Sequence, residues 1–309
     1  PNHFGFDEYC LWQLNRTRAE GERYANPLIT QNGKDLPRNE DGYGPRIISD
    51  FLQDFIDRNS ENPFFIYYPM VLPHDPFVPT PDSPEWADKT RRYEHDTIYF
   101  DDMIAYVDKI IGQLEAKLKE KGLWENTLFI FTADNGTNPS VLSNTNYGIV
   151  KGGKGSTLNT GNHVPMIVNW PEKIEKSRVF HGIVDFADVL PTLADVAGIN
   201  PSTYYTDGKS FINVLNGENS RTDKNEVFIH YTPRWGKLGH NLWVMNGEYK
   251  LYRDSRFYNT LKDPFEKKQI SNPGEDEQKI KARFEAILKE KENEFPFEQN
   301  NTEFKPGNN

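Results

Sequence analysis

The strongest constraint in this sequence is a repeated pairing of an amphipathic helix with a short, continuous apolar run. Apolar residues at helical spacing predict a helix over residues 45–58. The Asn62-Pro63 pair then breaks the helical pattern, and residues 64–68, which read FFIYY, predict a buried strand. The apolar stripe of the predicted helix comprises Ile47, Ile48, Phe51, Leu52, Phe55 and Ile56.

The same pairing occurs again along the chain. A long helix is predicted over residues 96–122, with lysines near its C-terminal end and a glycine that stops it, and residues 127–131 predict a second buried strand. Residues 132–162 are a long loop rich in Gly, Asn, Ser and Thr, after which residues 164–168 predict a third strand and residues 186–197 a further helix. This alternation predicts the α/β class, with a central sheet flanked by helices.

The sequence pattern changes after about residue 215. Three short strands and a charged helix are predicted there, at residues 226–231, 242–246, 249–252 and 276–292. They predict a small C-terminal antiparallel sheet closed by a helix and followed by a polar tail. We therefore divide the chain into an α/β domain over residues 1–215 and a C-terminal α+β subdomain over residues 216–309.

Charge and cysteine content exclude several classes of protein. The chain carries 36 basic and 46 acidic residues, a net charge of −10, so a nucleic-acid partner is not expected. No apolar run approaches the roughly 20 residues that a membrane span needs. The single cysteine, Cys10, excludes an internal disulfide framework and a zinc site built from cysteines. The sequence begins at Pro1 without a signal peptide, and we expect that a leader was removed or that the chain is part of a longer protein.

Polar residues near the ends of the predicted strands are suited to an anion or a metal. His74 lies between prolines that stiffen its loop, and a fixed imidazole could donate to an anionic oxygen or protonate a leaving group. The alternative is a loop histidine that a backbone carbonyl satisfies. Asp134 and Asn135 offer hard oxygen ligands for Ca²⁺ or Mg²⁺. An Asp-Asn-Gly turn at the end of a strand accounts for the same two residues without a metal.

A glycine-rich loop, residues 152–157, carries Lys154 and could bring its ammonium and bare amides close to an oxyanion. A flexible exposed loop accounts for the same composition. A cation site, a lysine and a histidine at one sheet edge would together suit a tetrahedral dianion such as sulfate or phosphate. We therefore predict that the candidate side chains converge at one end of the sheet, namely His74, Asp134, Asn135 and Lys154.

In their order and spacing, these motifs resemble the sulfatase family of the alkaline-phosphatase-like superfamily along nearly the whole chain. Residues 131–136, FTADNG, match the family's Asp-Asn-Gly metal motif, and residues 73–77, PHDPF, resemble its Pro-His-x-Pro loop. Residues 152–165 resemble its lysine loop and the strand that follows. Further similar segments are residues 4–9, 170–171, 188–193, 197–199 and 258–266.

The resemblance implies a role for each matching position. Asp134 and Asn135 would bind a divalent ion, usually calcium, Lys154 would contact the sulfate, and His74 would contact the sulfate or the leaving-group oxygen. The family nucleophile is a formylglycine made from Cys or Ser in a Cys/Ser-x-Pro/Ala-x-Arg motif. That motif is absent from these 309 residues and is expected upstream, as are two metal aspartates and a Lys and a His of the family site.

We therefore expect this chain to be the C-terminal two-thirds of an arylsulfatase-like sulfuric ester hydrolase that is inactive without its nucleophile. The expected substrate is a sulfate ester, either a sulfated sugar or an aryl sulfate, and the resemblance implies an exported protein. Two alternatives stay open: a phosphoester or phosphonate ester hydrolase of the same superfamily, and a non-catalytic sulfatase-like fragment. The roles of Asn159, in a segment that reads Glu-Gly-Gly in many relatives, and of His163, which often aligns with Arg, stay open as well.

Overall fold

The computed structural model describes residues 1–309 apart from 13, 15–22, 175–177, 218–223, 234–238 and 295–309. The chain divides into two compact units. The first unit comprises Pro1–Thr127 and Ser140–Lys151, and the second comprises Leu128–Pro139 and Gly152–Asn309. The predicted polar tail lies outside the described residues. No helix in the described part of the chain is long and apolar enough to cross a membrane.

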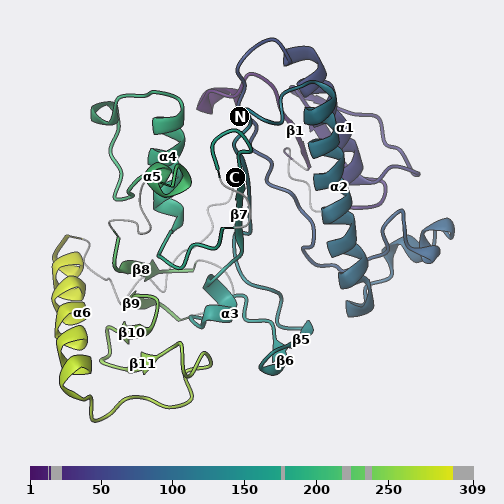
Figure 1. The fold of residues 1–309 in the computed structure, drawn as a ribbon. Helices are drawn as coiled ribbons and strands as arrows, with labels where there is room; N and C mark the ends of the chain where they lie inside the picture. The colour runs from purple at the N-terminus through teal and green to yellow at the C-terminus, as the bar shows by residue number, and fades with distance from the viewer. Residues whose placement is uncertain (13, 15–22, 175–177, 218–223, 234–238, 295–309) are drawn as a thin grey trace, which may run out of the picture. The chain divides into compact units, whose positions relative to one another are not determined.

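Two long helices dominate the first unit and pack against each other (Figure 1). The helix α1, Gly44–Asn59, confirms the helix predicted over residues 45–58. The helix α2, Phe100–Glu120, with the 3-10 turn η4, Thr97–Tyr99, before it, confirms the helix predicted over residues 96–122. Each buries one apolar stripe, as helical periodicity requires. The buried side chains of the stripes include Ile48, Leu52 and Ile56 on α1 and Met103, Val107, Ile110 and Leu114 on α2.

Short strands complete this unit. β1, Cys10–Trp12, β2, Ile29–Gln31, and β3, Lys34–Asp35, form an antiparallel sheet in the order β1-β2-β3. Cys10 and Ile29 of this sheet share a buried cluster with Ile48 of α1. The predicted loop over residues 132–162 contains a hairpin here, made by β5, Leu142–Thr145, and β6, Gly148–Lys151. Short 3-10 turns lie at η1, Asn2–Phe4, η2, Pro84–Ala87, and η3, Arg91–Tyr93.

The strand predicted at residues 64–68 is wrong, because this stretch has no regular secondary structure. Its side chains alternate between half-buried and exposed, and Phe65 and Tyr67 are 59% and 66% exposed. Phe64 packs edge-on against Phe55 of α1, with 5.9 Å between the ring centroids. A strand needs hydrogen bonds to a neighbouring strand, and no described strand pairs with these residues. A run of apolar residues indicates that some of its side chains are buried. It does not indicate that another strand is available to pair with it.

The second unit begins with a two-stranded antiparallel sheet. β4, Phe129–Thr132, and β7, Met166–Asn169, confirm the strands predicted at residues 127–131 and 164–168. The turn η5, Phe186–Asp188, and the helix α4, Val189–Val196, confirm the helix predicted over residues 186–197. Met166 and Val168 pack against a buried cluster at the helix α5, Ile212–Leu215. The short elements α3, Asn159–Asn162, and η6, Pro201–Thr203, were not predicted.

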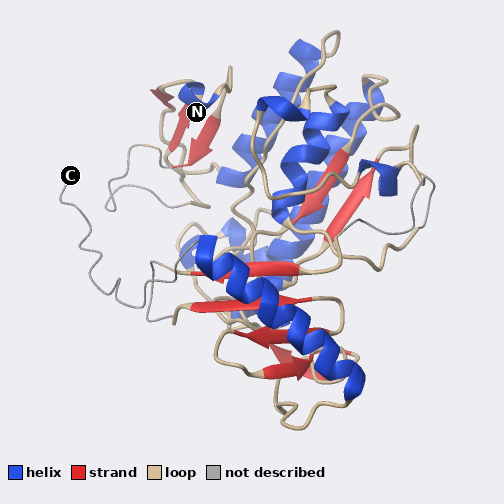
Figure 2. Ribbon diagram, turned by 90° about the vertical axis from the view of Figure 1, so that its left-hand side faces the viewer, coloured by secondary structure: helices blue, strands red, loops and turns tan. Residues whose placement is uncertain are grey.

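A four-stranded antiparallel sheet and one helix form the C-terminal part of this unit. The strand order is β11-β10-β9-β8, and α6, Glu275–Glu294, lies across one face (Figure 2). The strands are β8, Val227–Tyr231, β9, Asn241–Met245, β10, Tyr249–Tyr252, and β11, Phe257–Asn259. Leu251 of β10 and Phe284 of α6 are fully buried in the cluster between them. The predicted small antiparallel sheet with its closing helix is confirmed, although β11 was missed. The boundary at residue 215 stays a prediction.

Candidate functional site

The pairing of β4 with β7 brings two loops to one edge of their sheet. Because the strands are antiparallel and Thr132 lies opposite Met166, the end of β4 lies beside the start of β7. At this edge, Oγ1 of Thr132 donates to the carbonyl of Pro165 over 2.9 Å. The loop that carries Asp134 and Asn135 therefore starts next to the segment that leads into β7.

Backbone hydrogen bonds join this loop to α3 and to the lysine loop, which we define as residues 152–157. The amide of Gly136 donates to the carbonyl of Gly161 over 2.9 Å. The amide of Lys154 donates to the carbonyl of Thr137, also over 2.9 Å. The metal-motif loop and the lysine loop of the family resemblance are thus neighbours within one compact unit.

Two glycines permit α3 to lie close against both loops. A Cβ atom at Gly136 would lie 1.9 Å from the carbonyl oxygen of Thr160, and one at Gly153 would lie 2.2 Å from Oγ1 of the same threonine. Separations this short cannot exist between non-bonded atoms in a close-packed interior. Gly136 and Gly153 are therefore required by the packing of the two loops against α3.

Three polar side chains on these loops are not engaged elsewhere. Asp134, Asn135 and Lys154 make no side-chain hydrogen bond or ion pair within the part of the chain that the structure describes. Asp134 is exposed, and the other two are half-buried. In contrast, the backbone amides of Lys154 and Ser156 already donate to carbonyls of these loops. The group that the lysine loop offers to an anion is therefore the Lys154 ammonium and not these two amides.

Asp134 and Asn135 provide oxygen atoms of the type that a hard divalent cation binds, but too few of them to complete its coordination. Carboxylate and amide oxygens are suitable ligands, whereas Ca²⁺ takes six to eight oxygens. Among the described residues there is no group of three or more His, Cys, Asp or Glu side chains that could hold a metal ion. These two residues could therefore form only part of a metal site.

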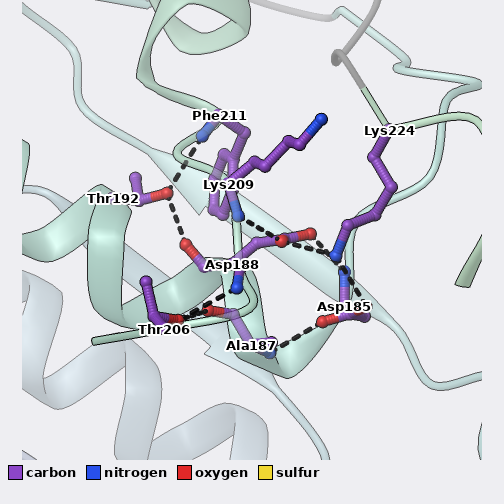
Figure 3. A network of polar contacts seen from close by, with 9 residues as sticks. Asp185, Ala187, Asp188, Thr192, Thr206, Lys209, Phe211 and Lys224 are labelled. Carbon is purple, nitrogen blue, oxygen red and sulfur yellow. Dashed lines mark hydrogen bonds and ion pairs between the residues drawn. The ribbon is translucent and has the colours of Figure 1, made fainter. Parts of the chain in front are cut away.

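A second acidic pair in this unit, Asp185 and Asp188, is engaged within the fold (Figure 3). Nζ of Lys224 lies 2.7 Å from Asp185 Oδ2 and 2.6 Å from Asp188 Oδ1. Asp188 also accepts from the amide of Lys209 over 2.8 Å, and its own carbonyl accepts from Oγ1 of Thr192. Burial opposes the charged form of Lys224, but its bonds to both carboxylates outweigh this and raise its pKa. The segment at residues 188–193 therefore has a structural role.

His74 lies in the first unit, where several residues surround it. Nδ1 of His74 is 2.6 Å from Nη1 of Arg23 and 2.7 Å from the carbonyl oxygen of Asp75. The hydroxyl of Tyr24 donates to the His74 carbonyl. Among the described residues, Nε2 makes no hydrogen bond, so this nitrogen is the one open to a ligand. The convergence of His74 with Asp134, Asn135 and Lys154 stays a prediction.

The two positions that depart from the family pattern lie on and beside α3. Oδ1 of Asn159 is buried and has no hydrogen-bond partner in the described part of the chain. His163 caps the C-terminal end of α3 through its amide, which donates to the carbonyl of Asn159 over 2.9 Å, and the residue is exposed. The structure assigns neither side chain a ligand.

Sequence reasoning missed the residues that contact the candidate groups from distant segments. Tyr231, Lys250 and Tyr252 of the C-terminal sheet contact the lysine loop, and Arg23 and Tyr24 contact His74. One signal was available, because residues 249–252 read YKLY and place a lysine inside an apolar strand. A lysine in such a position is almost never fully buried unless it is paired. The arginine and the tyrosines had no comparable signal.

Comparison with protein families gives two matches. The family described as "Sulfatase" matches residues 1–199, and the family described as "N-sulphoglucosamine sulphohydrolase, C-terminal" matches residues 154–294. Human steryl-sulfatase is 29% identical over 202 residues, which cover 63% of this chain and 33% of that protein. Human arylsulfatase A is 29% identical over 212 residues, 67% of this chain and 39% of that protein. A sulfatase from Formosa agariphila is 31% identical over 208 residues, 60% of this chain and 37% of that protein. The chain spans about a third of the length of these relatives.

Solved structures share the fold. A protein in complex with k-i-k-neocarrahexaose aligns with a TM-score of 0.74 at 24% identity, over 97% of this chain and 68% of that chain. A protein in complex with its substrate D-glucosamine-2-N,6-O-disulfate aligns with a TM-score of 0.71 at 18% identity, over 94% and 76% of the two chains. At these identities the likeness concerns the fold, and the predicted alkaline-phosphatase-like α/β fold is confirmed.

Proposed function

Because this chain belongs to the sulfatase family, we propose that it carries part of the active site of a sulfuric ester hydrolase. The observation that supports this most directly is the set of unengaged side chains at the edge of the β4–β7 sheet. Asp134, Asn135 and Lys154 lie on two loops joined by the backbone hydrogen bond from Lys154 to Thr137, and none of the three side chains has a partner among the described residues. An anion site with a partial cation site requires such groups.

Lys154 would act on the sulfate group that is transferred. Its ammonium is a compact point charge on a flexible stem, so its position depends on how well the backbone beneath it is held. The bond from its own amide to Thr137 and the close packing at Gly153 hold that backbone. A lysine that is placed before the reaction begins stabilises the charge that develops on sulfate oxygens without reorganising.

Asp134 and Asn135 would supply part of the shell of a divalent cation, which we propose to be calcium. When bound, this ion would neutralise charge on the sulfate oxygens. The carboxylate would contribute charge and the amide a neutral oxygen, and the remaining ligands would come from other parts of the complete protein. The nucleophile of the complete protein would be a formylglycine, whose sequence motif these 309 residues do not contain.

His74 would contact the sulfate or the leaving-group oxygen through Nε2, since its Nδ1 is occupied by Arg23 and the Asp75 carbonyl. An imidazole held through one nitrogen can donate a proton through the other. This role depends on the predicted convergence of His74 with Lys154.

A sulfated sugar is the substrate class that we favour. The match to the C-terminal model of N-sulphoglucosamine sulphohydrolase and the fold shared with a protein solved with D-glucosamine-2-N,6-O-disulfate support this choice. Steryl and aryl sulfates are the competing class, because steryl-sulfatase and arylsulfatase A are among the relatives. Export of the complete protein, expected from the family resemblance, stays a prediction.

The deciding experiment compares hydrolysis of p-nitrophenyl sulfate, p-nitrophenyl phosphate and a 6-O-sulfated glucosamine by the complete protein. We expect sulfate release, with the highest kcat/KM on the sugar. Lys154→Ala should lower kcat/KM by about 10²–10³, the scale of losing one preorganised partner of an oxyanion. The matched control is Lys151→Ala, which removes an exposed lysine three residues away and should leave turnover unchanged.

Three results would contradict the proposal. A higher kcat/KM on the phosphate ester would identify a phosphoester hydrolase, and no turnover of any ester would identify a non-catalytic relative. Wild-type kinetics in Lys154→Ala would remove the lysine from the site. We also propose that the isolated 309-residue chain does not turn over a sulfate ester, because it lacks the formylglycine motif. Turnover by the isolated chain would show that its nucleophile had been misidentified.

A further inference from the structure

A fully buried lysine lies in the middle of the C-terminal sheet. Lys250 of β10 is 0% exposed. Side chains alternate along a strand, and Tyr249 and Leu251 of β10 point into the apolar cluster beneath α6. Lys250 and Tyr252 therefore occupy the opposite face, where Trp243 of β9 also packs. This second face of the sheet is not covered by α6.

Lys250 forms a buried ion pair with Glu266. Nζ of Lys250 lies 2.9 Å from Oε1 of Glu266, and the hydroxyl of Tyr252 donates to Oε2 over 2.7 Å. The Glu266 side chain is 5% exposed, and its backbone adopts a φ of +53°, which non-glycine residues rarely adopt. Replacing a buried ion pair by apolar residues is often neutral or stabilising, so such a pair alone is weak support for a role in stability.

The same buried groups also hold the lysine loop. Nζ of Lys250 donates to the carbonyl of Thr157, and the hydroxyl of Tyr252 lies 2.8 Å from Oγ1 of Thr157. Tyr231 of β8 donates to the carbonyl of Gly155 over 3.1 Å. Three side chains from two strands of one sheet, β8 and β10, thus bind the loop just after its lysine. A loop with three glycines has few other restraints on its backbone.

We propose that the Lys250–Glu266 pair, together with Tyr252 and Tyr231, is a positioning device for Lys154. The pair orients the Lys250 ammonium and the Tyr252 hydroxyl toward Thr157, and these two groups hold the C-terminal half of the lysine loop on the rigid sheet. Lys154 is then presented to the sulfate group from a fixed backbone. This inference rests on the proposed function of Lys154, since it names the residues that act through that lysine.

The geometry shows why such a device would matter. A displacement of about 1 Å at a group that acts on the reacting centre can cost about 10²-fold in rate. The amide of Lys154 anchors one side of the loop to Thr137, and the C-terminal sheet anchors the other side through Gly155 and Thr157. Loss of the second anchor would leave Lys154 in place but less constrained.

The test uses Tyr252→Phe and Tyr249→Phe in the complete protein. Both substitutions remove one hydroxyl from β10, but Tyr252 faces the lysine loop and Tyr249 faces the cluster beneath α6. Hydrogen exchange followed by mass spectrometry should show faster exchange of the peptide over residues 152–158, by about tenfold, in Tyr252→Phe only. Lys250→Met should have the same effect on exchange. If Lys250→Met does not fold, the exchange measured in Tyr252→Phe decides the test.

Kinetics then connect the anchor to Lys154. Tyr252→Phe should lower kcat/KM by about tenfold on a sulfate ester, and it should have no further effect in a Lys154→Ala background, because residues that act as a unit are not additive. If Tyr252 had a purely structural role, Tyr252→Phe would lower kcat/KM by the same factor in the wild-type and the Lys154→Ala backgrounds.

Unchanged exchange over residues 152–158 in Tyr252→Phe would overturn the inference whatever the activity. Two further results for Tyr252→Phe would overturn the inference although exchange over residues 152–158 is faster. One is a wild-type kcat/KM, and the other is a loss of kcat/KM in the Lys154→Ala background as large as the loss in the wild-type background. Wild-type kinetics in Lys154→Ala would instead contradict the proposed function, and the exchange measurement would still decide whether the sheet holds the loop.

Discussion

Nη1 of Arg23 lies 2.6 Å from Nδ1 of His74, so a permanently charged donor faces one ring nitrogen of the candidate catalytic histidine. A guanidinium can only donate, and it therefore favours the tautomer in which Nδ1 accepts and Nε2 carries the proton. The Asp75 carbonyl at 2.7 Å and the Asp75 carboxylate at 3.3 Å favour the opposite tautomer. Charge-assisted bonds are the stronger ones, and of the two charged groups the guanidinium at 2.6 Å is closer than the carboxylate at 3.3 Å, so the arginine should prevail.

We predict that Arg23→Ala switches His74 from the Nε2–H to the Nδ1–H tautomer, because only the Asp75 acceptors then remain near Nδ1. The ¹⁵N chemical shifts of the imidazole ring, measured on neutral histidine, distinguish the two tautomers. His95 is the control, since its Nδ1 accepts from the amide of Phe77 over 2.8 Å and does not depend on Arg23. A proton on Nδ1 of His74 already in the wild type would contradict the prediction.

We predict that Asp134→Ala loses calcium but keeps its fold. The carboxylate is exposed and has no partner among the described residues, so its removal should change the free energy of unfolding by no more than about 0.5 kcal/mol. Removing one anionic oxygen should weaken binding of a hard cation. Calcium content and thermal unfolding of the complete protein check both parts. Asp195→Ala, which removes an exposed carboxylate from α4, is the control and should retain calcium. Equal calcium content in the two variants would show that Asp134 does not bind the ion and is only part of a turn.

We predict that Gly136→Ala destabilises the protein, whereas Gly112→Ala stabilises it. The new methyl group at position 136 would lie 1.9 Å from the carbonyl oxygen of Thr160, so the metal-motif loop and α3 must separate, at a cost of about 1–3 kcal/mol. Position 112 lies in the exposed face of α2, where a methyl group meets nothing within 4 Å. Alanine there should add about 0.5–1 kcal/mol through its helix propensity. Urea unfolding measures both, and a Gly136→Ala variant as stable as the wild type would contradict the packing argument.

We predict a loss of stability above pH 9 that depends on Cys10. Burial raises the pKa of the Cys10 thiol from 9.0 to about 11, and the residue is 6% exposed. Below pH 9 both the folded and the unfolded states are protonated and the contribution is complete. Between pH 9 and 11 the unfolded state loses the proton first, so the free energy of unfolding falls, by roughly 2–3 kcal/mol in total.

The measurement is the difference in unfolding free energy between the wild type and Cys10→Ala, taken from urea titrations at pH 8, 9.5 and 11. The difference cancels the titration of lysines and tyrosines that both proteins share. A difference that stays constant over this range would show that the thiol ionises equally in both states.

Local pattern was sufficient for the longer helices. The apolar stripes over residues 45–58 and 96–122 correspond to α1 and α2 within a few residues, because helical hydrogen bonds join residues four apart and burial of one face leaves a period in the sequence. Three strands of the C-terminal sheet were also found, since short runs of alternating or apolar residues between turn residues are typical of strands. The same reasoning failed at residues 64–68, where the run is apolar but no described strand pairs with it.

The sequence by itself determined the four longer helices, five of the eleven described strands, the order of the motifs and the identity of the candidate groups, including Asp134 and Lys154. The tertiary structure alone decided which loops meet and what holds them. The antiparallel register of β4 with β7 places the two loops at one edge, and Lys250 reaches Thr157 across 93 residues of chain. Such contacts leave no trace in local periodicity, because they depend on pairing and on polar partners far apart in the sequence.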